Sequence, residues 1–256
     1  MHPQEIVDRA LELSRSGLTD REVALKCGIS VGALRHWRRG DRRAPDGRDR
    51  VTKAQCPRCH DRPLDGRAYA YLFGLYLGDG HIVRTGNRGV YRLEIYCDDG
   101  WPGIAAETAQ AIAAVMPGLK VGRRQHQGCS GVGAYSKHWP CVFPQHGPGM
   151  KHTRRIALVE WQQAIVEEHA REFVRGLIHS DGCRCINRVR RPLKDGDRWY
   201  EYPRYLFKNA SDDIRRLYTD ALDRLGIAWK QNNVREISVA RRDAVARLDE
   251  FVGPKY

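Results

Sequence analysis

The sequence predicts an α+β protein with two copies of an αββαββα unit, related by a pseudo-twofold axis and preceded by a small all-α unit. Two observations favour this fold class. Segments 71–80 and 173–182 each combine an apolar helical run with an Asp-Gly end, and their acids, Asp79 and Asp181, lie 102 positions apart. After each acid, strand-like and helix-like patterns follow in the same order.

The charge balance favours a polyanionic partner. The 256 residues include 44 Lys and Arg against 31 Asp and Glu, a formal net charge of +13. Such an excess favours nucleic acid, with an acidic membrane surface as the alternative. No apolar run approaches the ~20 residues of a membrane span, and the N-terminus does not resemble a signal peptide. With eight Cys and no secretory signal, we expect an intracellular protein in the cytoplasm, associated with the nucleoid.

Residues 1–44 are predicted to form a helix-turn-helix domain. Apolar residues from Ile6 onwards give a first helix that ends at Gly17, and Thr19 caps a second helix. Gly28 suits the tight turn before a third helix. This third helix would present the DNA-contacting residues Arg35, His36, Arg38 and Arg39. A three-helix protein-interaction module is the alternative.

Residues 45–66 are predicted to be a basic linker, either an arm along the DNA phosphates or a solvated tether. Within it, Cys56 and Cys59 have the spacing of half a zinc knuckle. A fourfold structural zinc site would need distant ligands, and the candidates are His60, Cys141, Cys183 and Cys185. Free thiols are the alternative. A catalytic zinc is not expected, because no acid lies nearby in a hydrolytic arrangement.

The first repeat, residues 67–160, begins with a helix at 67–79. Its remaining predicted elements are a hairpin at 80–97, a helix around 102–116, a hairpin around 119–136 and a short helix near Lys137.

The second repeat, residues 161–256, has a helix around 169–181. Its other predicted elements are strands near 183–190 and 199–208, a helix at 212–225, a hairpin at 227–239 and a helix at 241–251. Each repeat has a lysine near its end, at a similar distance from its acid. Lys151 lies 72 residues after Asp79, and Lys255 lies 74 residues after Asp181.

At these residues the chain resembles the LAGLIDADG homing endonucleases in their single-chain, two-repeat form. Segments 72–80 and 174–182 carry the resemblance, which covers residues 67–256. It implies a monomer whose strands form a saddle on double-stranded DNA. Small residues four positions apart, Gly74 with Gly78 and Gly176 with Ser180, would let two helices cross closely and bring the acids together.

The resemblance implies that Asp79 and Asp181 are catalytic metal ligands, with one DNA strand cut near each. Adjacent carboxylates repel, and Mg²⁺ (or Mn²⁺) relieves that repulsion and activates water. The carbonyls of Gly78 and Ser180 would lie near the metal. Lys151 and Lys255 match the family's catalytic lysines, which polarise water or stabilise the phosphate charge. His179 and Leu77 stand where the family commonly has an acid, two residues before each Asp.

The strands are expected to contact DNA through basic and amide side chains. The predicted contacts are Arg84, Arg88 and Arg92 in the first repeat and Arg184, Asn187, Arg188, Arg190 and Arg191 in the second. The sequence therefore predicts a site-specific, metal-dependent double-strand DNA endonuclease. The alternative is a non-cleaving, sequence-specific transcriptional regulator that uses the same saddle. A maturase-like role on RNA is a third hypothesis.

Overall fold

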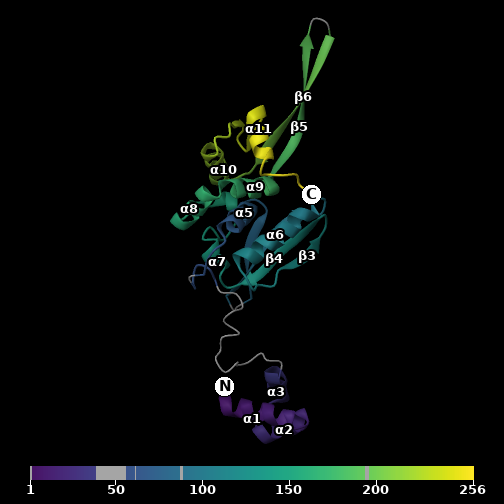
Figure 1. The fold of residues 1–256 in the computed structure, drawn as a ribbon, viewed down its shortest axis with the longest axis vertical. Coiled ribbons are helices and arrows are strands. Elements are labelled where there is room, and N and C mark those ends of the chain that lie inside the picture. The colour runs from purple at the N-terminus through teal and green to yellow at the C-terminus, as the bar shows by residue number, and fades with distance from the viewer. Residues whose placement is uncertain (1, 39–55, 61, 87–88, 194–195) are drawn as a thin grey trace. The chain divides into compact units, whose positions relative to one another are not determined.

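The computed structural model describes residues 2–38, 56–60, 62–86, 89–193 and 196–256 (Figure 1). It divides into two compact units, Met1–Lys53 and Ala54–Tyr256. The predicted DNA contacts Arg39 and Arg88, and most of the basic linker, lie outside the described residues. Among the described residues, no helix is long and apolar enough to cross a membrane.

The N-terminal unit has the three predicted helices. They are α1 (Gln4–Arg15), α2 (Asp20–Cys27) and α3 (Val31–Arg38). Thr19 and Glu22 form a reciprocal capping box at the start of α2, which satisfies two otherwise unpaired backbone amides. Gly28 turns the chain with φ +63°, a left-handed conformation that glycine adopts without strain. Leu34 and Trp37 of α3 are buried against the other two helices.

The first repeat has the predicted αββαββα order. Its elements are α5 (Gly66–Leu77), β1 (Gly80–Thr85), β2 (Val90–Asp98), α6 (Pro102–Val115), β3 (Gly122–His126), β4 (Cys129–Ser136) and α7 (Trp139–Val142). A 3-10 turn (Lys151–Thr153) and α8 (Glu160–Glu168) then lead to the second repeat. Because α8 belongs to neither copy of the repeated pattern, the duplication gave no signal for it.

The second repeat follows the same order. Its elements are α9 (Ala170–Asp181), β5 (Gly182–Leu193), β6 (Gly196–Lys208), α10 (Asp212–Arg224), β7 (Lys230–Asn233), β8 (Glu236–Val239) and α11 (Arg242–Asp249). The hairpin β5–β6 is longer than the predicted strands at 183–190 and 199–208. Only residues 205–208 of β6 pair with β8, so the outer part of the ribbon projects beyond its sheet (Figure 1).

Two four-stranded antiparallel sheets confirm the predicted α+β class. Their strand orders, β1-β2-β4-β3 and β5-β6-β8-β7, are the same when counted from the start of each repeat. Helices α5 and α9 run side by side at the centre of the larger unit (Figure 1). Every residue of α5 from Tyr69 to Leu77 is buried. A helix that is apolar all round is typical of a central position, and here it shares one hydrophobic core with both sheets.

Candidate active site

Two glycines let α5 and α9 touch through their backbones. A Cβ atom placed on Gly74 would lie 2.6 Å from the carbonyl oxygen of Phe173, and one on Gly176 would lie 2.2 Å from that of Tyr71. Neither position tolerates a side chain without moving backbone atoms. A Cβ on Gly78 would lie 2.2 Å from Ser180 Oγ. The predicted stripe of small residues is therefore the contact between the two helices.

The two helix ends bring Asp79 and Asp181 to one region, and they end differently. Helix α5 stops at Leu77, two residues before its acid, whereas α9 continues through Asp181. In α9, the hydroxyl of Ser180 donates to the carbonyls of Gly176 and Leu177. The expected helix at 67–79 is thus shorter than predicted, because the backbone leaves the helical path at Gly78.

Both carboxyl groups titrate above the ordinary range of an aspartate. Desolvation, followed by repulsion from Asp181, raises the pKa of Asp79 to about 6. Desolvation also raises the pKa of Asp181. Asp79 is nevertheless exposed and Asp181 is half-buried. These observations agree, because a carboxyl group in the wall of an open cavity is surrounded by protein atoms and still meets water. The two acids form a strained pair of negative charges that a ligand can reach.

Lys151 caps the end of α5. Its Nζ donates hydrogen bonds to the carbonyls of Tyr76, Gly78 and Gly80 at 2.6, 2.5 and 2.8 Å. Tyr76 and Gly78 lie at the C-terminal end of α5, where a cation is favourable, and Gly80 begins β1. Desolvation lowers the pKa of Lys151 to about 8, and the charges of Asp181 and Asp79 oppose this shift.

Lys255 holds the matching place in the second repeat more loosely. Its Nζ donates to the carbonyl of Ser180 at 3.4 Å. Desolvation lowers its pKa, and Asp79 is the first of the charges that oppose the shift.

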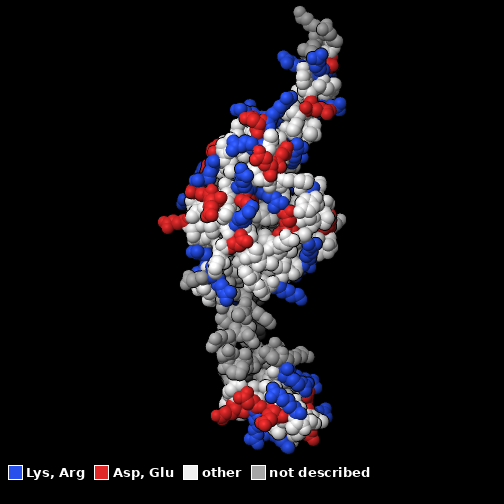
Figure 2. Space-filling model, in the orientation of Figure 1, with Lys and Arg blue, Asp and Glu red and all other residues white. Residues whose placement is uncertain are grey.

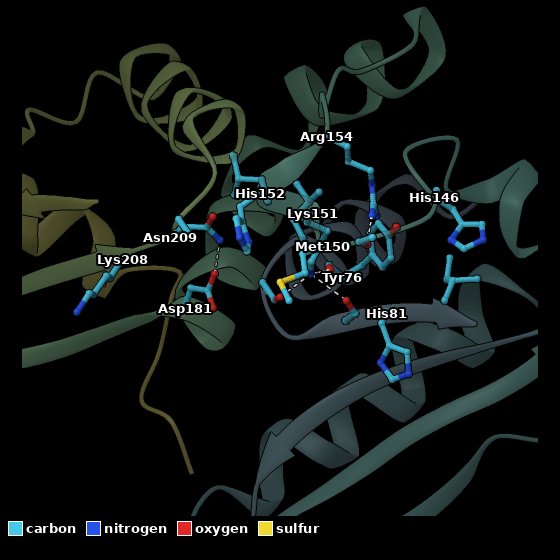
Figure 3. Close-up of a pocket in the computed structure, with 18 residues that line it drawn as sticks. Tyr76, His81, His146, Met150, Lys151, His152, Arg154, Asp181, Lys208 and Asn209 are labelled. Atoms are coloured by element: carbon cyan, nitrogen blue, oxygen red, sulfur yellow. Dashed lines mark hydrogen bonds between the residues drawn. The ribbon is translucent and has the colours of Figure 1, made fainter. Parts of the chain in front are cut away.

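The acids and lysines pair crosswise between the repeats. A cavity of about 520 Å³ is lined by Lys151 together with Asp181, and a second cavity is lined by Lys255 together with Asp79 (Figure 3 shows the first). Each cavity therefore combines the carboxylate of one repeat with the lysine of the other. The four predicted catalytic residues form two related half-sites.

Asn209 is a site residue that the sequence analysis missed. It follows β6, and its side-chain amide donates to Asp181 Oδ2 at 2.5 Å (Figure 3). This bond fixes the carboxylate of Asp181 and opposes its raised pKa. The signal available in the sequence was an amide residue two positions before the Ser211 cap of α10, directly after a strand that pairs with the strand following the acid.

His179, two residues before Asp181, is a buried residue with structural contacts. Its Nε2 donates to the carbonyl of Val252 at 3.0 Å, and its Nδ1 accepts the hydroxyl of Tyr71 at 2.9 Å. Both nitrogens of a neutral imidazole are thereby satisfied. Desolvation lowers the pKa of His179 to about 4, with the charge of Arg175 as the next cause. His179 thus joins α5 and α9 to the C-terminal segment.

Two of the residues predicted to contact DNA in the N-terminal unit already form ion pairs within that unit. Arg35 and Arg38 both form ion pairs with Asp20, at 2.9 and 2.8 Å, while more than half of each arginine side chain stays exposed. His36 lies on the same helix, α3. The contact of these residues with DNA stays a prediction.

In the first sheet, the strand pairing separates the predicted contacts onto two faces. Arg92 lies on the face opposite the helices with Glu94, with which it forms a buried ion pair. The guanidinium of Arg92 also lies over the ring of Tyr135 at 5.8 Å. Arg84 is exposed and alternates onto the other face, close to the hairpin turn.

In the second sheet, the predicted contacts along the long hairpin β5–β6 are likewise separated onto two faces. Tyr205 and Phe207 are buried against the helices, so the residues paired with them share that face. Three predicted contacts lie on this side and form ion pairs: Arg184 with Asp249, Arg188 with Glu201, and Arg190 with Asp197. Figure 2 shows this mixture of Lys and Arg with Asp and Glu along the ribbon.

The open face of the hairpin carries the remaining two predicted contacts, Asn187 and Arg191. The strand pairing adds basic and aromatic residues to this face that the sequence analysis did not name: Arg198, Tyr200, Tyr202 and Arg204. Arg198 lies directly across from Arg191, and both are exposed. Period-two alternation in β6 is the signal that would have selected these residues.

Four possible metal ligands meet between the segment that precedes α5 and the turn that contains α7. The ligand atoms of Cys56, Cys59, His138 and Cys141 all lie within 4.8 Å of one another. Of the distant partners expected for Cys56 and Cys59, only Cys141 is in this cluster. His60 instead accepts the backbone N–H of Cys56, and Cys183 and Cys185 lie on β5. The sequence prediction did not include His138, because the second pair of ligands is His-x2-Cys rather than a second Cys-x2-Cys.

Comparisons with known proteins found similarity among solved structures. No family model matches the chain, and no curated protein matches it. A structure of I-DmoI in complex with DNA and Mn is 16% identical, with a TM-score of 0.49 over 75% of this chain and 99% of that one. The LAGLIDADG meganuclease I-AabMI, bound to uncleaved DNA, is 9% identical with a TM-score of 0.46 over 72% and 82% of the two chains. The homing endonuclease I-WcaI, bound to its DNA recognition sequence, is 12% identical with a TM-score of 0.45 over 76% and 84%.

Proposed function

We propose that this chain is a metal-dependent, site-specific endonuclease that acts as a monomer and cuts both strands of double-stranded DNA. The observation that carries the proposal is the crosswise pairing of Asp79 with Lys255 and of Asp181 with Lys151, in two cavities at the tips of crossed helices. Two half-sites in one chain match the two antiparallel strands of a duplex, one strand at each.

The residues at the tips fit a divalent cation such as Mg²⁺ or Mn²⁺. The carboxylates of Asp79 and Asp181 are hard oxygen ligands of the kind that these ions prefer. Desolvation and, after it, repulsion from Asp181 raise the pKa of Asp79, and a bound cation would offset both costs of ionising this carboxyl group. The carbonyls of Gly78 and Ser180 offer further oxygens. When bound, the cation would activate water and neutralise charge on the phosphodiester.

The chain's own residues have separate roles in this proposal. Asn209 orients the carboxylate of Asp181 through its 2.5 Å hydrogen bond. Lys151, fixed by three carbonyls, offers positive charge to a phosphate oxygen in the cavity that it shares with Asp181. Lys255 has the same role beside Asp79.

DNA would lie against the open faces of the two sheets. Asn187, Arg191, Arg198 and Arg204 of the long ribbon are the side chains best placed to meet it, since the arginines of the other face already pair with acids. The width of a two-stranded ribbon suits a major groove, where Arg and Asn read base edges. The N-terminal unit would bind flanking DNA through α3 and lengthen the recognised site.

A randomised duplex library, incubated with the full chain in Mg²⁺ or in EDTA, tests the proposal. We expect a defined sequence to be cut on both strands in Mg²⁺ and to be bound but uncut in EDTA. Asp79→Asn and Asp181→Asn should each lower the cleavage rate by at least about 100-fold or leave only nicking, with binding retained. Asp243→Asn, an equal change of charge at an exposed position on α11, is the control.

The second candidate function is a DNA-binding transcriptional regulator that does not cut. The observation that favours it is the separate N-terminal unit with its capped helix-turn-helix pattern. Enrichment of one sequence by binding, with no product in Mg²⁺ or Mn²⁺, would establish this function and exclude the nuclease.

Removal of residues 1–53 tests the contribution of the N-terminal unit. The larger unit begins at Ala54 and has its own core. The shortened chain should bind its target more weakly, and its affinity should depend less steeply on salt because phosphate contacts are lost. An unchanged salt dependence would exclude contact of the N-terminal unit with DNA phosphates.

A further inference from the structure

The cluster of Cys56, Cys59, His138 and Cys141 lies outside the proposed nuclease site. Cys56 and Cys59 precede α5, whereas His138 and Cys141 belong to the turn that contains α7. The two pairs have the same spacing, with two residues between the ligands. The fold therefore joins two half-knuckles from segments more than 75 residues apart.

We propose that these four side chains bind one structural Zn²⁺ ion. Three thiolates and an imidazole form a Cys₃His set, a common composition of structural zinc sites. With Zn–S bonds of about 2.3 Å in a tetrahedron, neighbouring sulfur atoms lie about 3.8 Å apart. The sulfurs of Cys59 and Cys141 are 3.4 Å apart, and all four ligand atoms lie within 4.8 Å of one another. Side-chain movements of about an ångström or less would bring the four ligand atoms to tetrahedral separations.

The surroundings of Cys56 have the features of a metal knuckle. Cys56 is fully buried, and the backbone N–H groups of Arg58 and Cys59 face its sulfur. Desolvation disfavours a buried thiolate, and N–H groups that face the sulfur offset part of that cost. His60 Nδ1 accepts the N–H of Cys56 at 3.0 Å, so His60 shapes the turn rather than serving as a ligand. The ring of His60 also contacts that of His138, with centroids 5.4 Å apart.

The composition of the site indicates a structural role. Four protein ligands fill a tetrahedral zinc shell and leave no position for a reacting water. Cys59 is exposed and His138 and Cys141 are half-buried, so a metal ion can enter from solvent. The sulfur and nitrogen ligands of this cluster differ from the oxygen ligands at Asp79 and Asp181. Mg²⁺ prefers oxygen ligands and would not compete for the thiolates.

The ion would join three parts of the larger unit. It would tie the segment before α5 to α7, whose following residue, Phe143, packs against Tyr76 of α5 with ring centroids 4.6 Å apart. Arg58, between the two cysteines, lies over the ring of Trp161 in α8 at 4.4 Å. Because the four ligands come together only in the folded chain, the free energy of metal binding adds to the free energy of folding. The site would therefore stabilise the start of the helix that presents Asp79.

Metal analysis of the full chain, purified without chelator, tests the proposal. We expect about one equivalent of zinc per chain, lost in Cys141→Ser. Cys185→Ser, which alters a half-buried cysteine on β5, is the matched control and should keep the metal. The proposal is overturned if wild-type protein contains no zinc and takes none up when zinc is added, or if both variants lose it equally.

A second measurement uses the wild-type chain, so that it does not depend on the folding of a variant. Protein stripped of metal should bind one equivalent of Co²⁺ and develop the visible absorption of tetrahedral cobalt bound to thiolates. Added Zn²⁺ should displace the cobalt, and added Mg²⁺ should not. Cobalt binding without thiolate absorption, or a Cys59–Cys141 disulfide found by mass spectrometry in protein purified under reducing conditions, would contradict the proposal.

Discussion

In the first repeat, Lys151 donates to three carbonyls at the end of α5, whereas in the second repeat Lys255 donates to one carbonyl at 3.4 Å. In the second repeat, Asn209 donates a hydrogen bond to Asp181, whereas among the described residues no side chain donates one to Asp79. The first repeat therefore fixes its lysine, and the second repeat fixes its acid. Because the two repeats contribute crosswise, the cavity that contains Lys151 and Asp181 has both groups held in place, whereas the cavity with Lys255 and Asp79 has a weakly held lysine and an acid without such a donor in the described part of the chain.

The repeats differ again away from the site. The first has short strands and the cluster of Cys and His, while the second has a ribbon of 12- and 13-residue strands with exposed arginines. What they share is the contact between α5 and α9, where Gly74 and Gly176 have equivalent places. We call this α5–α9 contact the shared seam. Both copies must keep it to pack against each other, whereas a surface contact can be kept by one copy alone, so the surroundings can diverge.

The largest effect should come from the shared seam. Gly74→Ala and Gly176→Ala each place a Cβ within 2.6 Å of a backbone oxygen of the facing helix. We expect each to lower the free energy of unfolding by about 3 kcal/mol, since backbone must move in a packed core. Gly122→Ala, with no atom within 4 Å of its Cβ, is the control. Urea denaturation measures all three, and a large difference between the two seam variants would show that the seam is not symmetric.

The two lysines should differ in their structural contribution. Lys151→Met leaves three helix-end carbonyls without their donor and should cost about 2–3 kcal/mol, or roughly 4–12 °C in Tm. Lys255→Met, the matched change, should cost less than about 1 kcal/mol. Thermal unfolding of the metal-free chain makes the comparison. Equal losses would refute the asymmetry drawn from the hydrogen bonds.

His179 should make stability depend on pH, whereas its counterpart Leu77 cannot. The pKa of His179 is lowered to about 4 by desolvation, so below its unfolded pKa of about 6.5 the unfolded chain binds a proton that the native chain does not. Stability is complete above pH 6.5 and should fall by about 2 kcal/mol by pH 5.

The raised pKa values of Asp79 and Asp181 act in the opposite direction, because the native chain gains protons first as the pH falls. The comparison of wild type with His179→Gln removes this contribution, which both chains share. Urea denaturation between pH 4 and 7 should give a difference that shrinks as the pH falls. A difference that does not vary with pH would exclude titration of His179 as its source.

The smallest expected effect concerns the two faces of the ribbon. Arg191→Ala and Arg198→Ala, on the open face, should each weaken DNA binding by about fivefold and reduce the salt slope by about 1. Arg188→Ala should change binding less, because Arg188 already pairs with Glu201 at 3.0 Å. Fluorescence anisotropy at several salt concentrations measures these differences. A greater loss in Arg188→Ala would place DNA on the other face of the ribbon.

Cleavage should lose rate as the pH falls towards the raised pKa of Asp79, about 6, because a protonated carboxyl group no longer binds a divalent cation. A rate that stays constant from pH 8 to 5 would show that the ionised form of Asp79 is not required.

The duplication made much of the fold predictable. Two apolar runs that end in Asp-Gly, followed by the same order of strands and helices, were enough for the αββαββα units and for the small-residue contact at Gly74 and Gly176. Helix α8 and the extra length of β5–β6 were not predictable in the same way. Neither has a counterpart among the described residues of the other repeat, so comparison of the copies gave no information about them.

The sequence by itself determined the order of helices and strands along each repeat and the position of the two acids, because local periodicity and glycine spacing encode these features. Only the tertiary structure decided which lysine meets which acid, which arginines are already paired with acids, and that His138 and Cys141 join Cys56 and Cys59. Those are contacts between residues far apart in the chain. Side-chain direction and distance across a fold set them, and no local pattern records either quantity.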